Sequence, residues 1–91
     1  MEYALITGAS SGIGKEFARI LAKDYALILV ARREERLNEL AKELNTECKI
    51  ISADLSKKVE CYRLMDEVKN LDIEVFINNA GFGDCGYFFK N

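Results

Sequence analysis

The sequence predicts an α/β fold with a doubly wound parallel sheet. Three observations carry this prediction. Short apolar runs alternate along the chain with segments of helical periodicity. The apolar runs lack the polar alternation of a half-exposed sheet, as expected when helices cover both faces. A glycine-rich turn joins the first run to the first helical segment. Strands and helices in strict alternation indicate right-handed crossovers between parallel strands.

The first strand and the first helix lie on either side of the glycine turn. Residues 3–7, "YALIT", are short and apolar, which is typical of a buried strand. The next segment has apolar residues at every fourth position and charged residues between them, which predicts an amphipathic helix. Its apolar stripe consists of Ile13, Phe17, Leu21 and Tyr25.

The same alternation continues to the end of the chain. Residues 26–31, "ALILVA", predict a second strand, "CKIISA" a third and "IEVFINNAG" a fourth. The helix before the third strand is marked by Leu37, Leu40, Ala41 and Leu44, and the helix before the fourth by Cys61, Leu64, Met65 and Val68, with Ser56 as its N-cap. This succession is Rossmann-like, with the expected strand order 3-2-1-4.

Composition limits the classes of function. The 91 residues suffice for one domain, and a formal net charge of −2 gives no sequence-wide field for nucleic acid or an acidic membrane. The longest apolar run, residues 25–31, is too short to cross a bilayer, and the start does not resemble a signal peptide. Three cysteines without a C-x-x-C pair, in a sequence without histidine, predict no metal site and a cytoplasmic protein.

The glycine turn, "TGASSGIG", is the strongest functional signal. Gly8, Gly12 and Gly14 form G-x-x-x-G-x-G, which is neither the common dinucleotide motif nor a P-loop. At a strand-to-helix turn, Gly8 permits a tight bend, Gly12 leaves room for a pyrophosphate and Gly14 allows close packing. Ser10 and Ser11 add hydroxyl donors, and the helix N-terminus attracts anions.

Two other interpretations of this turn are weaker. It is either a tight turn without a ligand, or a P-loop suggested by Gly14 and Lys15. Against the P-loop, five residues rather than four separate Gly8 from Gly14, and Glu16 replaces the hydroxyl residue that binds Mg²⁺.

Together with "NNAG" at residues 78–81, the turn resembles the TGxxxGxG branch of the short-chain dehydrogenase/reductase family, and the resemblance covers the whole chain. It implies that Asp54 and Leu55 contact the adenine ring; from the residues alone, Asp54 is also compatible with a helix-start carboxylate beside Ser56. It implies that Asn79, Ala80 and Gly81 line the ribose side of the cofactor, while Asn78 ties strands together. The implied diphosphate loop is Gly8, Ser10, Ser11, Gly12, Ile13 and Gly14.

The end of the second strand predicts the cofactor. Ala31 occupies the place where an acidic residue binds the ribose 2′-hydroxyl of NAD, and Arg32 and Arg33 follow with groups suited to a phosphate. NADP(H) is therefore favoured over NAD(H). The alternative is a solvated, mutually paired charge run at residues 32–36. Some NADP-preferring relatives carry a second basic residue in the glycine loop, where this chain has Ser11.

The family's catalytic residues are not found. None of the four tyrosines is followed four residues later by lysine, so the Y-x-x-x-K pair is missing and no catalytic residue is assigned. We expect residues 1–91 to be the NADP-binding N-terminal part of an oxidoreductase that transfers hydride between NADP(H) and an alcohol or ketone, truncated after the fourth strand. The alternative is a stand-alone NADP(H)-binding module without chemistry.

In a sheet that ends with the fourth strand, residues 75–80, "VFINNA", would form an exposed edge. This exposed edge predicts a homo-oligomer.

Overall fold

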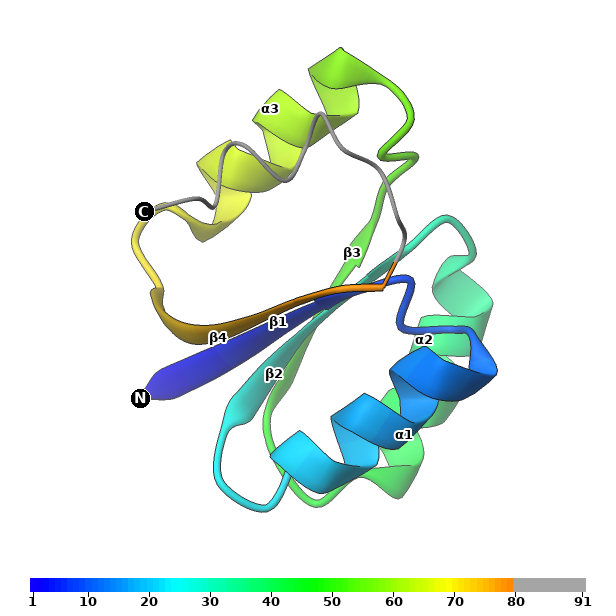
Figure 1. Ribbon diagram of the computed structural model, residues 1–91, viewed down its shortest axis with the longest axis vertical. Coiled ribbons are helices and arrows are strands. Elements are labelled where there is room, and N and C mark those ends of the chain that lie inside the picture. The colour runs from blue at the N-terminus through cyan, green and yellow to red at the C-terminus, as the bar shows by residue number, and fades with distance from the viewer. Residues whose placement is uncertain (80–91) are drawn as a thin grey trace.

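The computed structural model describes residues 1–79, in which strands and helices alternate (Figure 1). The elements in chain order are β1 (Glu2–Thr7), α1 (Gly12–Leu21), β2 (Ala26–Ala31), α2 (Glu34–Glu43), β3 (Cys48–Ser52), α3 (Lys58–Val68) and β4 (Asp72–Asn78). Every predicted strand and helix that falls within these residues is present, which confirms the α/β class.

The strands form one parallel sheet in the order β3-β2-β1-β4, as predicted. Figure 1 shows α1 and α2 on one face of the sheet and α3 on the other. All six residues of β2 are buried, because both of its faces are covered. Leu27 and Leu29 pack on the side of α1 and α2, whereas Ile28 and Val30 pack on the side of α3.

The carboxyl ends of the strands are level with one another. Thr7 at the end of β1 pairs with Val30 in β2 and with Asn78 in β4. The buried Thr7 hydroxyl also donates a hydrogen bond of 3.0 Å to the Asn78 side-chain oxygen, so Asn78 ties two strands together, as predicted. The turns after β1, β2 and β3 therefore meet at one edge of the sheet.

The predicted apolar stripe of α1 is wrong in two respects. The helix ends at Leu21, so Tyr25 lies beyond it, in the turn to β2. Gly14 and Ala18 face the sheet instead, whereas the side chains of Ile13 and Phe17 are 65% and 38% exposed. Small residues allow the helix to approach the strands closely, and large ones at those positions would hold it away.

The N-cap prediction for α3 is also wrong. Lys57 occupies the cap position and makes no side-chain cap hydrogen bond. Ser56 lies one residue too early, and its hydroxyl donates to the Asp54 carboxylate at 2.7 Å. A local Asx turn thus takes the hydroxyl that a cap would need.

Strand β4 lies at the edge of the described sheet, paired with β1 alone. Its central residues Val75, Phe76 and Ile77 are only half-buried.

At the amino end of the sheet, the exposed side chains of Glu2, Asp72 and Glu74 form an acidic group. None of the described helices has the length and apolar character of a membrane span.

Candidate functional site

A cavity of about 320 Å³ opens at the carboxyl edge of the sheet, between the turns that follow β1, β2 and β3. Its volume is at the small end of the range of ligand pockets in proteins. In open α/β sheets, ligands bind outside the carboxyl ends of the strands. The cavity is lined by Gly8, Ser10, Ser11, Val30, Ala31, Arg32, Arg36, Ala53, Leu55 and Asn79.

The Gly8 carbonyl oxygen organises the first side of the cavity. Gly8 has a positive φ of 64°, a backbone conformation that residues with a side chain rarely adopt. Its carbonyl oxygen accepts hydrogen bonds from the Ser11 amide at 3.1 Å, the Ser11 hydroxyl at 3.0 Å and the Asn79 side-chain amide at 3.1 Å. The turn after β1 is therefore joined both to the start of α1 and to the end of β4.

Ser11 acts as the N-cap of α1. Its hydroxyl oxygen accepts hydrogen bonds from the Gly14 amide at 3.1 Å and from the Asn79 side-chain amide at 2.6 Å. Its single hydroxyl hydrogen is directed at Gly8, so in this arrangement Ser11 has no donor left for a bound phosphate. The Ser10 hydroxyl makes no hydrogen bond among the described residues and lines the cavity, so it is the available donor.

Gly14 and Gly12 differ in how closely they are packed. A Cβ at Gly14 would clash with the Gly8 carbonyl oxygen and lie 2.9 Å from the Ala9 Cα, so the close approach of α1 to β1 demands glycine there. A Cβ at Gly12 would meet no atom within 4 Å. The packing of the described residues therefore does not require glycine at Gly12.

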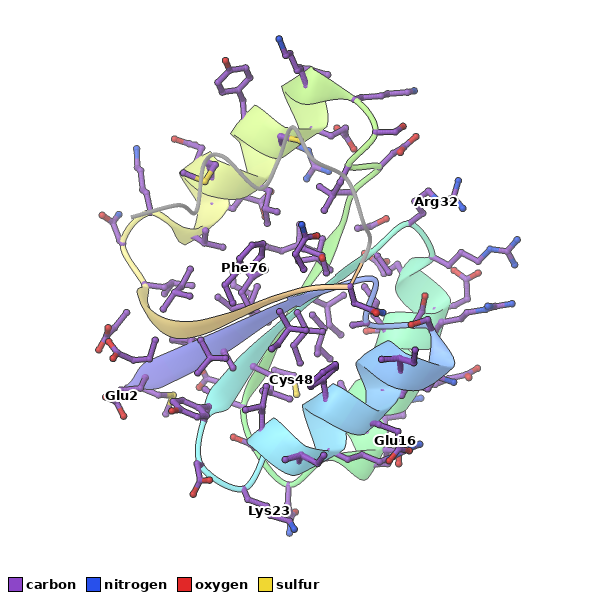
Figure 2. All side chains as sticks on the ribbon, in the orientation of Figure 1. Glu2, Glu16, Lys23, Arg32, Cys48 and Phe76 are labelled. Carbon is purple, nitrogen blue, oxygen red and sulfur yellow. The ribbon has the colours of Figure 1, made fainter. Side chains whose placement is uncertain are left out.

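The second side of the cavity is basic. Arg32 follows β2, and its backbone carbonyl accepts a 3.0 Å hydrogen bond from the Ser52 hydroxyl, which fixes the turn against β3. Figure 2 shows Arg32 at this turn, at the end of the sheet opposite Glu2. Arg36, in the first turn of α2, also lines the cavity, whereas Arg33 does not.

The arginines near the cavity are not paired with acidic residues. Arg32, Arg33 and Arg36 make no ion pair among the described residues, although Glu34 and Glu35 are their neighbours in sequence. Residues 32–36 are all exposed, as the alternative of a solvated charge run predicts, but the mutual pairing that it also predicts is not found among the described residues.

The third side of the cavity follows β3. Leu55 is 4% exposed and lines the cavity with Ala53. Asp54 does not itself line the cavity, and one of its carboxylate oxygens accepts hydrogen bonds from the Ser56 hydroxyl at 2.7 Å and the Ser56 amide at 3.1 Å. These two hydrogen bonds hold the pKa of Asp54 below its usual range, so the carboxyl is ionised at neutral pH.

Two residues of α3 hold this turn in place. The Asp54 amide donates a hydrogen bond of 3.2 Å to the Glu60 carboxylate, and the Arg63 guanidinium donates one of 2.6 Å to the Ser52 carbonyl. The paired Arg63 guanidinium lowers the pKa of Glu60, which keeps this acceptor ionised.

Of the residues expected to bind a cofactor, Gly8, Ser10, Ser11, Arg32, Leu55 and Asn79 line the cavity. Gly12, Ile13, Gly14, Arg33 and Asp54 do not, and Ala80 and Gly81 lie outside the described residues. Four lining residues were not predicted as site residues: Val30, Ala31, Arg36 and Ala53. Val30, Ala31 and Ala53 share a signal of position, because each lies at or just beyond the carboxyl end of a strand, whereas Arg36 lies in the first turn of α2 and carries no such signal.

A family model described as short chain dehydrogenase matches residues 2–90. The chain is 50% identical over 86 residues to the very-long-chain 3-oxoacyl-CoA reductase of Kluyveromyces lactis, a match covering 87% of this chain and 25% of that protein. The chain thus spans about a quarter of that relative's length.

Two solved structures have a similar fold. A short-chain dehydrogenase from Sphingobium yanoikuyae in complex with NADPH superposes with a TM-score of 0.79 and 35% identity, over 90% of this chain and 34% of that one. A metagenomic short-chain oxidoreductase in complex with NADP has a TM-score of 0.80 and 31% identity, over 90% of this chain and 40% of that one. The chain has the α/β fold of these short-chain oxidoreductases, and it belongs to the short-chain dehydrogenase family.

Because a side chain at Gly14 would clash and one at Gly12 would not, alanine should affect stability differently at the two positions. Gly14→Ala should lower the free energy of unfolding by roughly 1–3 kcal/mol, because the added methyl group forces α1 away from β1. Gly12→Ala is the matched control and should leave stability unchanged or raise it by up to about 1 kcal/mol through helix propensity. Urea denaturation measures both, and equal losses of stability in the two variants would contradict this assignment.

Proposed function

We propose that this chain binds NADP(H) in the cavity at the carboxyl edge of its sheet and forms the cofactor-binding portion of a short-chain oxidoreductase. The whole enzyme would transfer hydride between NADP(H) and an alcohol or ketone. The observation that carries the proposal is the composition of the cavity wall. It combines a glycine turn at a helix N-terminus with an unpaired arginine and a small apolar wall. These suit a diphosphate, a ribose phosphate and an adenine ring, respectively.

The diphosphate is assigned to the glycine turn. The amides at the start of α1 lack intrahelical acceptors, and the positive end of the helix dipole favours an anion. Glycine at position 12 leaves the backbone at the start of α1 without a covering side chain, and the Ser10 hydroxyl, which lines the cavity, supplies a donor. Ile13 contributes only its backbone, because its side chain is 65% exposed and lies away from the cavity.

The adenine ring is assigned to the side of the cavity formed by Val30, Ala53 and Leu55. Asp54 has a second carboxylate oxygen that makes no hydrogen bond among the described residues, and an ionised carboxylate can accept one from the adenine amino group. Asn79 borders the cavity beside the glycine turn, which supports its place on the ribose side; Ala80 and Gly81 stay predictions from the motif.

The preference for NADP(H) is assigned to Ala31 and Arg32. Ala31 is 8% exposed and places a methyl group where a carboxylate would repel a 2′-phosphate. Arg32 offers a planar cation for bidentate contact with a phosphate. The NADPH and NADP complexes of the two similar structures support a nicotinamide dinucleotide as ligand.

Replacing Arg32 tests the cofactor preference. A charge-assisted hydrogen bond contributes roughly 1.5–3 kcal/mol, so Arg32→Ala should weaken NADPH binding about tenfold or more and leave NADH binding nearly unchanged. Calorimetric titration with each cofactor measures the two affinities. Equal losses for NADPH and NADH would contradict a phosphate contact.

The purified 91-residue chain should not reduce carbonyl compounds. It has no Y-x-x-x-K pair, so it lacks the proton donor that carbonyl reduction in this family uses. Loss of NADPH absorbance with a panel of ketones measures turnover. A rate that survives repurification and rises in proportion to the concentration of this chain would contradict the prediction.

The chain should also self-associate. Val75 and Ile77 of the edge strand β4 are half-buried against the core on the side of α1, and Ile20 on α1 is 60% exposed. A twofold contact between two copies would cover this surface and pair the edge strand. Phe76 is unsuitable as a probe because it packs toward the α3 core.

Sedimentation over a range of protein concentrations tests this association. Ile20→Lys should shift the equilibrium toward monomer. The control Val59→Lys should not, since Val59 is 69% exposed on α3, across the sheet. A monomer at high micromolar concentration would exclude the association, and equal effects of the two variants would exclude the surface.

A further inference from the structure

We propose that Arg36 joins Arg32 as a determinant of NADP(H) specificity, so that the two guanidinium groups hold the 2′-phosphate between them and Arg33 takes no part. The proposal rests on the proposed function, that is, on NADP(H) binding in the cavity at the carboxyl edge of the sheet. It differs from the expectation based on sequence alone, which assigned the phosphate to the adjacent pair Arg32 and Arg33.

Position in the fold separates the three arginines. Arg32 lies in the turn after β2, and Arg36 is the third residue of α2, which begins at Glu34. Both line the cavity, although they come from different elements. Arg33 is the N-cap residue between them and does not line the cavity. The chain bends at Arg32 between β2 and α2, and Arg32 and Arg36 line the same cavity from the two sides of Arg33 in the sequence.

Charge pairing separates Arg32 and Arg36 from Arg19 and Arg63. Arg19 is held by Glu16 and Glu43, and Arg63 by Glu60 and Glu67. Arg36 has Glu39 three residues along the same helix, at a spacing that favours ion pairs, yet the two form none. Arg32 likewise has no ion pair among the described residues.

Two unpaired cations beside one cavity favour an anion with more than one charge. Guanidinium groups bind phosphate oxygens through paired, charge-assisted hydrogen bonds, and a phosphate monoester near neutral pH carries between one and two negative charges. The N-terminus of α2 also favours an anion. Arg33 makes no side-chain cap hydrogen bond, so the first-turn amides of the helix have no cap acceptor. A 2′-phosphate placed beyond Ala31 would face both arginines and this helix terminus.

The test compares Arg36→Ala with the matched control Arg33→Ala in the full chain. Calorimetric titrations use NADPH, NADH, 2′,5′-ADP and 5′-AMP, since the second pair isolates the 2′-phosphate from the nicotinamide half. Arg36→Ala should weaken NADPH and 2′,5′-ADP about tenfold and leave NADH and 5′-AMP within about twofold. Arg33→Ala should leave all four within about twofold. Thermal unfolding of both variants verifies that these exposed substitutions leave the fold intact.

The outcomes distinguish this inference from the proposed function. Equal effects of Arg36→Ala and Arg33→Ala, or equal losses for NADPH and NADH in Arg36→Ala, would overturn the role of Arg36 while leaving that of Arg32 in place. An unmodified chain that binds NADPH no more tightly than NADH, or binds neither, would overturn the proposed function and this inference with it.

Discussion

Hydrogen bonds to the carbonyl oxygen of Gly8 connect the turn after β1 with the start of α1 and with the residue that follows β4. This oxygen accepts three hydrogen bonds, two from Ser11 at the start of α1 and one from Asn79 beyond β4. It occupies the space that a side chain on Gly14 would need, so the helix can lie against the strand only where both residues are glycine. The direction of the α1 N-terminus, and hence the donors facing the cavity, depends on this close approach.

The two ends of the small sheet carry different groups of charged side chains. The amino end gathers Glu2, Asp72 and Glu74, and hydrogen bonding and repulsion from Asp72 raise the pKa of Glu74. A raised carboxyl pKa in the folded state means that ionisation of Glu74 opposes folding, and this opposition disappears as the pH falls through that pKa. The carboxyl end presents Arg32 and Arg36, which make no ion pair within residues 1–79. A chain with a net charge of only −2 thus has a local site suited to anions.

The strands and their order could be predicted because buried parallel strands are continuous apolar runs and helices separate them. The orientation of side chains on α1 could not be predicted. A four-residue spacing of large apolar residues suggested a buried stripe at Ile13 and Phe17. Close packing against β1 instead selects the small residues Gly14 and Ala18. The turn glycines and Arg32 were predictable from a short motif and a strand end. Arg36 was not, because only the geometry of the turn into α2 brings it to the cavity.

The central claim is that the glycine turn binds the diphosphate of a nicotinamide dinucleotide. An NMR titration of the isotope-labelled chain with NADPH tests it most directly, because each backbone amide reports on its own surroundings. The account predicts that the largest shift changes lie at the amides from Gly8 to Gly14 and extend to Arg32. Changes confined to the amino end of the sheet around Glu2, or none at high NADPH concentration, would contradict it.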